Sequence, residues 1–88
     1  MSEEQDPRRR LAVALRYDHA GAPRVTAKGR GVLAAPILEL AAEHGVPVEE
    51  DAALAEALSQ IELDREIPVE LYEAVAAVLR FILMARGR

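Results

Sequence analysis

The sequence contains no cysteine and no tryptophan, and it has only one phenylalanine and two tyrosines among its 88 residues. Without cysteine the chain can form neither a disulfide framework nor a thiolate metal site, which is typical of a reducing cytosol. So few aromatic rings provide no platform on which the bases of a nucleic acid could stack. The fold must therefore be held together by an aliphatic core, and at this length it forms one small domain of modest stability.

Positive charge is also in short supply, because 11 basic residues face 15 acidic ones and give a net charge of -4. This balance opposes attraction to phosphates, so we expect no nucleic-acid partner. The longest mainly apolar stretch, residues 69–85, is interrupted by Glu70, Glu73 and Arg80. It is too polar to cross a bilayer core, which requires about 20 apolar residues. No apolar signal segment begins the chain, so we expect a soluble protein that does not span a membrane.

The residues that usually carry catalysis are absent or badly spaced. Neither Ser2 nor Ser59 sits in a G-x-S-x-G elbow. The glycines of 29–31 lack the spacing of a nucleotide-binding loop and predict a tight turn. The acidic run 49–51 lacks the spacing of a calcium loop, and His44 precedes a glycine at a predicted helix end, where an imidazole is a favourable neighbour of the last carbonyls. We therefore expect no enzyme, no catalytic residues, no metal and no cofactor.

Strand patterns dominate the first half of the chain. Residues 1–10 are polar and predict a flexible tail, so the folded domain is expected to span 11–88. The apolar run 11–15 predicts a strand covered on both faces, and residues 24–27 predict its antiparallel partner across a Gly/Pro turn. Residues 46–50, with valines alternating around a proline, predict a short third strand at a sheet edge.

Helical spacing follows in three segments. The first has an inward stripe of five residues, and Pro36 requires it either to begin near Ala35 or to kink. Asp51 predicts the N-cap of a short second helix, and Pro68 the first residue of the last helix. The order β-β-α-β-α-α predicts an α/β fold in which a small mixed sheet of about three strands packs with three helices. The inward residues are expected to be Leu33, Ile37, Leu40, Ala41 and His44, then Leu54, Leu58 and Ile61, then Leu71, Tyr72, Val75, Val78, Leu79, Ile82 and Leu83.

Five segments in the same order are similar to a known family. "AVALRYD", "APRVTAKG", "LAAEHGVPVEED", "ALAEAL" and "EIPVELYEAVAAVL" resemble the C-terminal cytoplasmic domain of the FlhB/YscU family, the substrate-specificity switch proteins of flagellar and type III export gates. The resemblance covers about residues 11–83. It implies a protein that works in bacterial protein export rather than an enzyme.

The sequence departs from the family pattern at the cleavage turn. In the family an Asn-Pro-Thr-His turn precedes the "AVAL" strand, and the asparagine cyclises and cuts the chain before the proline. Here the equivalent stretch is Pro7-Arg8-Arg9-Arg10, with no asparagine in position. We therefore expect no self-cleavage. The family's preceding strand and membrane anchor have no counterpart in this sequence either, so it resembles the fragment left after the cut.

Family members receive the export signals of rod-type and hook-type substrates on a small apolar patch. Carried over by position, the resemblance implies that the patch consists of Ala22, Pro23, Ala76 and Leu79. The first pair lies in the predicted turn, and the second pair lies one helical turn apart. Periodicity alone gives Leu79 a role in the core, so both roles stay open for it.

Two functions remain open. The first is a cytoplasmic component at the inner face of the export gate, which docks export substrates or stands in for the cleaved domain of a membrane-bound FlhB. Its partners would be export substrates and export-gate proteins. The second is a regulatory or self-associating adaptor that kept the fold only. An open edge beside residues 11–15 would allow strand capture or a homodimer formed by strand pairing.

Overall fold

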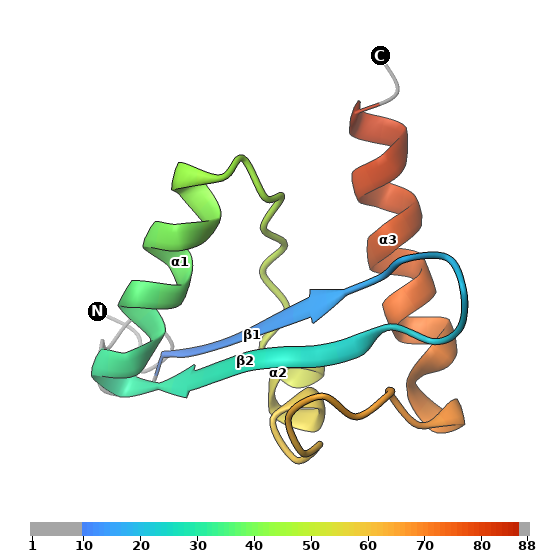
Figure 1. The fold of residues 1–88 in the computed structure, drawn as a ribbon, viewed down its shortest axis with the longest axis horizontal. Coiled ribbons are helices and arrows are strands. Elements are labelled where there is room, and N and C mark those ends of the chain that lie inside the picture. The colour runs from blue at the N-terminus through green and yellow to red at the C-terminus, as the bar shows by residue number, and fades with distance from the viewer. Residues whose placement is uncertain (1–9, 87–88) are drawn as a thin grey trace.

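The protein is a short β-hairpin packed among three helices within the range that the structure describes. The computed structural model describes the backbone of residues 10–86 and the side chains of residues 10–80. The expected tail up to residue 9 and the expected inward positions of Ile82 and Leu83 lie outside this description. In Figure 1 the hairpin runs between α1 at one end and α3 at the other. The elements are β1 (Leu11–Arg16), β2 (Arg24–Arg30), α1 (Ala34–Glu43), α2 (Ala52–Leu58) and α3 (Tyr72–Arg86).

The two strands form the antiparallel hairpin that the sequence predicts. Ala12 pairs with Gly29 and Val13 pairs with Lys28, and a β-bulge follows Ala14. Successive side chains of a strand point to opposite faces, so these two pairs lie on different faces of the hairpin. Both faces are covered, because α1 contacts both strands and α2 contacts β1.

Small residues allow α1 to approach its face closely. Gly29 is buried, and a Cβ placed on it would collide with the carbonyl oxygen of Leu33. Ala34, the first residue of α1, is fully buried, and Ala12 is buried on the strand. The backbone before α1 thus packs on the sheet, where a larger side chain would separate the two layers.

The opposite face carries the main core, and this core is aliphatic as expected. Its buried members are Val25, Leu58, Ile67 and Val75, which come from β2, α2, the segment before α3, and α3. The half-buried apolar residues packed against them are Val13, Leu15, Ala22, Leu54, Ile61, Leu71 and Leu79. Removing such apolar surface from water stabilises the fold by about 25 cal/mol per Å², and this burial holds the three elements against the hairpin.

The expected third strand at 46–50 is not confirmed. That segment is irregular and exposed, and the proline at its centre has no N–H to donate to a ladder. Residues 64–67 pair instead with the beginning of β2, through an isolated bridge between Arg24 and Glu66. The Val25 N–H donates to the Arg65 carbonyl (3.0 Å), and the Val25 carbonyl accepts from the Asp64 N–H (2.7 Å). The described sheet therefore has two strands and one bridged edge.

The face that α1 buries differs from the expected one. Ala34 is buried and Ile37, Leu38 and Ala41 are half-buried, whereas three residues of the expected stripe, namely Leu33, Leu40 and His44, are exposed. A 3₁₀ turn over Gly31–Leu33 precedes the α-helix, and its tighter winding puts Leu33 out of phase with the residues that follow. Pro36 falls in the first turn of α1, so the helix begins near Ala35 and needs no kink.

The expected helix ends are confirmed at α1 and α2. His44 is the C-cap of α1, and Gly45 follows with φ of 64°. The Val46 N–H donates to the Ala41 carbonyl (2.8 Å), as in a Schellman motif. Asp51 caps α2, because its Oδ1 accepts the Leu54 N–H at 3.0 Å.

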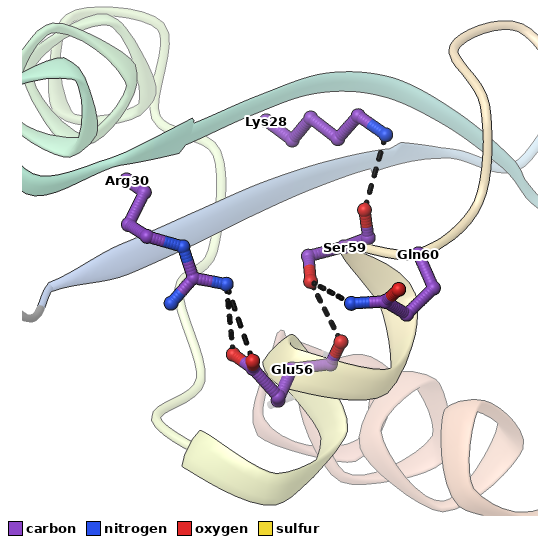
Figure 2. Close-up of polar contacts among 5 residues, drawn as sticks. All are labelled: Lys28, Arg30, Glu56, Ser59 and Gln60. Carbon is purple, nitrogen blue, oxygen red and sulfur yellow. Dashed lines mark hydrogen bonds and ion pairs between the residues drawn. The ribbon is translucent and has the colours of Figure 1, made fainter.

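Two basic side chains of β2 fasten α2 to the sheet, as Figure 2 shows. Lys28 Nζ donates to the carbonyl oxygens of Ser59 (3.0 Å) and Ile61 (2.7 Å). Ser59 is the C-cap of α2, where a cation is favourable, and Ile61 lies in the turn that follows. Arg30 Nη2 donates to both carboxylate oxygens of Glu56, at 3.2 Å to Oε1 and 3.0 Å to Oε2. The helix is thereby fixed in orientation as well as buried through Leu58.

The last helix begins later than its proline indicates. Pro68 is the N-cap of a 3₁₀ turn over Val69–Leu71, and α3 starts at Tyr72. Val75 is 1% exposed and anchors α3 on the core, as expected. Tyr72 is 46% exposed, so its expected inward position is wrong.

Candidate functional site

A shallow apolar groove of about 280 Å³ lies between the β1–β2 turn and α3. In Figure 1 this turn is drawn against the lower half of α3. The groove collects side chains from three separate parts of the sequence. Its lining residues are Tyr17, Gly21, Ala22, Pro23, Ile67, Tyr72, Val75, Ala76 and Leu79.

The turn forms one wall of the groove and is held in place by the chain before α3. The Ile67 N–H donates to the Pro23 carbonyl at 2.9 Å, and Pro23 itself is buried. Gly21 leaves room for a neighbour, because a Cβ there would lie 3.1 Å from Glu66 Oε2. Glu66 also pairs with Arg24 at 3.5 Å. The turn is thus clamped to the body of the protein.

The other wall is one face of α3. Tyr72, Ala76 and Leu79 are spaced by four and three residues, so they lie above one another on the helix. Ala76 is exposed and Leu79 is half-buried. Because alanine fills so little volume between the two larger residues, the surface is hollow at this point. Val75 and Ile67 close the floor as part of the core.

Both tyrosines of the chain line the groove. Tyr17 is 39% exposed and Tyr72 is 46% exposed, so each offers an apolar ring to a ligand while its hydroxyl can remain in water. The ring of Tyr17 stacks in a tilted geometry on that of His19, with the centroids 4.4 Å apart. The stacked neighbour supports the orientation of Tyr17 at the groove.

The four patch residues implied by the resemblance meet in this groove. Ala22 and Pro23 come from the turn wall, and Ala76 and Leu79 come from the helix wall. Leu79 also packs against the core, so it belongs both to the core packing that its spacing predicts and to the lining of the groove. Tyr17, Gly21 and Ile67 were not among the residues expected at a site, and helical spacing assigned Tyr72 and Val75 to the core. The two tyrosines could have been found as the rare aromatic residues that flank the turn and begin the helix.

The groove is lined mainly by apolar side chains. Its lining contains no acid, base or nucleophile other than the two phenol groups. Within residues 10–80, no three histidine, aspartate or glutamate side chains converge as a metal site would require. In the described range 10–86, every helix is too short or too polar to traverse a bilayer.

A family model described as "FlhB HrpN YscU SpaS Family" matches residues 7–82. The chain belongs to this family. Among its relatives, the uncharacterized protein YlqH of Bacillus subtilis (strain 168) is 45% identical over 82 residues, which cover 91% of this chain and 87% of YlqH. The flagellar biosynthetic protein FlhB of Salmonella typhimurium is 47% identical over 74 residues, or 81% of this chain and 19% of that protein. The same Bacillus strain also has a flagellar FlhB, 39% identical over 80 residues, or 88% of this chain and 22% of that protein.

The fold is that of solved family members as well. The crystal structure of the cytoplasmic domain of FlhB from Shewanella putrefaciens superposes with a TM-score of 0.78 at 34% identity, covering 89% of this chain and 69% of that one. Although this chain is nearly as long as YlqH, it spans only about a fifth of the flagellar FlhB proteins. The family resemblance of the sequence is thereby confirmed at the level of the cytoplasmic domain.

Proposed function

We propose that this chain is a non-enzymatic component of a bacterial flagellar or type III export apparatus. In this proposal it works in the cytoplasm at the inner face of the export gate, with rod-type or hook-type substrates and export-gate proteins as its partners. Its groove docks an apolar segment of an export substrate. The observation that carries the proposal is the convergence of Ala22, Pro23, Ala76 and Leu79 in one groove of a protein that belongs to the FlhB family.

The physical chemistry of the groove favours such a ligand. The exposed parts of Tyr17, Tyr72 and Leu79 can bury apolar surface, at about 25 cal/mol per Å². A segment with one aliphatic side chain would fill the hollow above Ala76. A single anchor of this size supports weak and reversible binding, because the costs of ordering the segment offset much of the burial. Reversible binding suits a protein that must pass cargo on.

The tyrosines provide a direct assay. Because both tyrosines line the groove and the chain has no tryptophan, a change in intrinsic tyrosine fluorescence reports events at this site. The full chain is titrated with apolar peptides from rod-type and hook-type proteins that lack tyrosine and tryptophan. We expect saturable quenching or enhancement with the wild type.

Two matched variants test whether the groove is the site. Ala76→Asp places a charge in the groove, whereas Ala77→Asp places the same charge on the same exposed helix but outside the lining. We expect the first variant to lose binding and the second to keep it, with equal circular dichroism spectra. Equal binding by both variants, or no binding of any export-derived peptide by the wild type, would contradict substrate docking and leave the adaptor as the better candidate.

A second candidate function is to stand in for the cytoplasmic domain of a membrane-bound FlhB. YlqH is a short relative that occurs in the same Bacillus strain as a longer FlhB, so one organism can carry both forms. A stand-in of this kind must attach to the longer protein. The outer edge of β1 offers a place for that attachment.

The backbone of β1 is oriented to accept a further strand. Val25 directs its N–H and carbonyl away from β1, toward residues 64–67, so its pair partner Leu15 must direct its own groups away from β2. By the period of two, Val13 and Leu11 do the same. Within residues 10–86, no backbone hydrogen bond from outside the hairpin reaches these three residues. The edge can therefore pair with an added strand.

The charges beside this edge distinguish its possible occupants. Arg10 directly precedes β1 and Arg16 is its last residue, and both are exposed. Two copies paired antiparallel about Val13 would bring Arg10 of one copy opposite Arg16 of the other, which is unfavourable. A strand of another protein with acidic flanks has no such conflict. We therefore favour capture of a foreign strand over a homodimer.

The test uses a bacterium whose FlhB is truncated after its membrane part. If the chain stands in for the missing domain, supplying it restores secretion of hook protein. Leu11→Pro removes an outward N–H at the first residue of β1, where proline is tolerated, so it should abolish the rescue. Arg16→Lys keeps the charge and should rescue normally. Absence of rescue by the wild type would refute the stand-in role, and a dimer in sedimentation that Leu11→Pro disrupts would assign the edge to a second copy.

A further inference from the structure

We infer that the rim of the groove selects the charges of the segment that docks there. Glu73 at one end and Arg80 at the other favour an apolar anchor flanked by one basic and one acidic side chain. This inference rests on the proposed docking function and names the class of ligand. It concerns residues beside the groove lining, not the lining itself.

The position of the two charges follows from the geometry of α3. Residues seven apart in an α-helix lie on nearly the same side, about 10.5 Å apart along the axis. Glu73 is one residue after Tyr72, and Arg80 is one residue after Leu79, so both stand next to the groove-lining face. They lie on its outer side, because the buried Val75 lies on the other. The charges thus mark the two ends of the helix wall.

Both side chains are available to a ligand. Glu73 and Arg80 are exposed, and within residues 10–80 neither forms an ion pair or a side-chain hydrogen bond. Other charges at the groove are already engaged: Glu66 pairs with Arg24 at 3.5 Å. Asp18 in the turn accepts the Ala20 N–H at 3.0 Å.

The charges of the surroundings reinforce the polarity of the rim. Glu70 precedes α3 in the chain and lies near its beginning, on the same side as Glu73 along the groove, whereas the charge of Glu66 is offset by Arg24. His19 stacks on Tyr17 and is the remaining titratable group of the turn. Arg80 is the one basic residue among the described side chains of α3, residues 72–80. The groove therefore has an acidic end at Ile67 and Tyr72 and a basic end at Leu79.

An extended peptide can match this spacing. In a strand, residues two apart point to the same side and rise about 3.3 Å each, so the first and fifth residues of a five-residue segment lie about 13 Å apart. A leucine at the centre would enter the hollow above Ala76. A lysine and a glutamate two residues on either side would then reach Glu73 and Arg80. Either chain direction satisfies the pairing.

The test compares peptides with a central leucine and four flank combinations: lysine with glutamate, two lysines, two glutamates, and two glutamines. Binding to the full chain is followed by tyrosine fluorescence. The mixed peptide should bind about two- to fivefold more tightly than either like-charged peptide, as expected for exposed ion pairs. This preference should disappear at about 0.5 M salt, where the screening length falls to a few ångströms.

Charge reversals on the protein should change the order of preference. With Glu73→Lys the two-glutamate peptide should bind best, and with Arg80→Glu the two-lysine peptide should bind best. Glu39→Lys, on the exposed surface of α1, changes the net charge by the same amount as Glu73→Lys and should keep the wild-type order. The acid at Glu73 also favours the N-terminus of α3, but that role alone would change stability and not peptide preference.

Two results would overturn the inference. If peptides bind the groove with affinities that ignore their flanks, or if both reversals leave the order unchanged, the rim does not select charge while docking itself stands. If the glutamine-flanked peptide and all others fail to bind, the docking function is refuted and the selection of charge with it.

Discussion

Val75→Ala should lower the stability of this protein more than any ordinary surface change, because Val75 joins the groove floor to the core. Its side chain is 1% exposed in α3. Loss of two buried methyl groups removes about 1.6 kcal/mol of transfer free energy, at about 0.8 kcal/mol each. The cavity left behind adds about 1 kcal/mol. The better helix propensity of alanine returns about 0.5 kcal/mol, so the net loss is about 2 kcal/mol.

The assay is urea unfolding followed by circular dichroism at 222 nm, with the free energies compared at equal slope. A loss of about 2 kcal/mol should lower Tm by about 10 °C in a domain of this size. Val69→Ala is the matched control, because Val69 is 66% exposed in the turn before α3 and its loss should stay within about 0.5 kcal/mol. Equal small losses for both variants would show that the contact of α3 with Val25 and Leu58 does not hold the fold together.

Three further predictions concern single residues and the chain itself. Asp51→Ala removes the cap acceptor of the Leu54 N–H and should cost about 1 kcal/mol in the same urea assay, whereas Asp51→Ser should restore most of it; no difference between the two would contradict the capping role. Gly45→Ala forces an alanine to φ of 64° and should cost about 1–2 kcal/mol, and a neutral result would exclude the left-handed end of α1. The chain contains no asparagine, so incubation at neutral pH should leave a single species of full-length mass; a pair of fragments separated before Pro7 would show that the cleavage chemistry survives.

Local chemistry made several features predictable. The hairpin followed from an apolar run, a Gly/Pro turn and a β-branched pair, and the capping roles of Asp51 and Gly45 followed from residue types at helix ends. The predicted third strand at 46–50 does not form. Valines that alternate around Pro47 give a strand-like pattern, but this pattern does not provide a neighbouring strand with which the segment could pair. Residues 64–67 bridge β2 instead, although nothing in their composition resembles a strand.

Helix α1 shows why the spacing of apolar residues does not always reveal which side of a helix is buried. Leu33 and Leu40 carry the apolar pattern, yet Ala34 is the buried residue, because the close approach at Gly29 decides which side of the helix meets the sheet. The groove likewise depends on how distant elements pack. Positions 22, 23, 76 and 79 were implied together by resemblance, but periodicity alone gave no reason for the turn to lie against α3.

The sequence by itself determined the aliphatic core, the caps, the hairpin and the family, because each depends on neighbouring residues or on segments in a fixed order. Only the tertiary structure decided that the turn, the segment at Ile67 and one face of α3 enclose a groove with a tyrosine on each wall. The physical reason is that a concave surface arises where elements distant in the chain are held at a fixed separation. Here that separation is set by the packing of Val25, Ile67 and Val75, which no local pattern records.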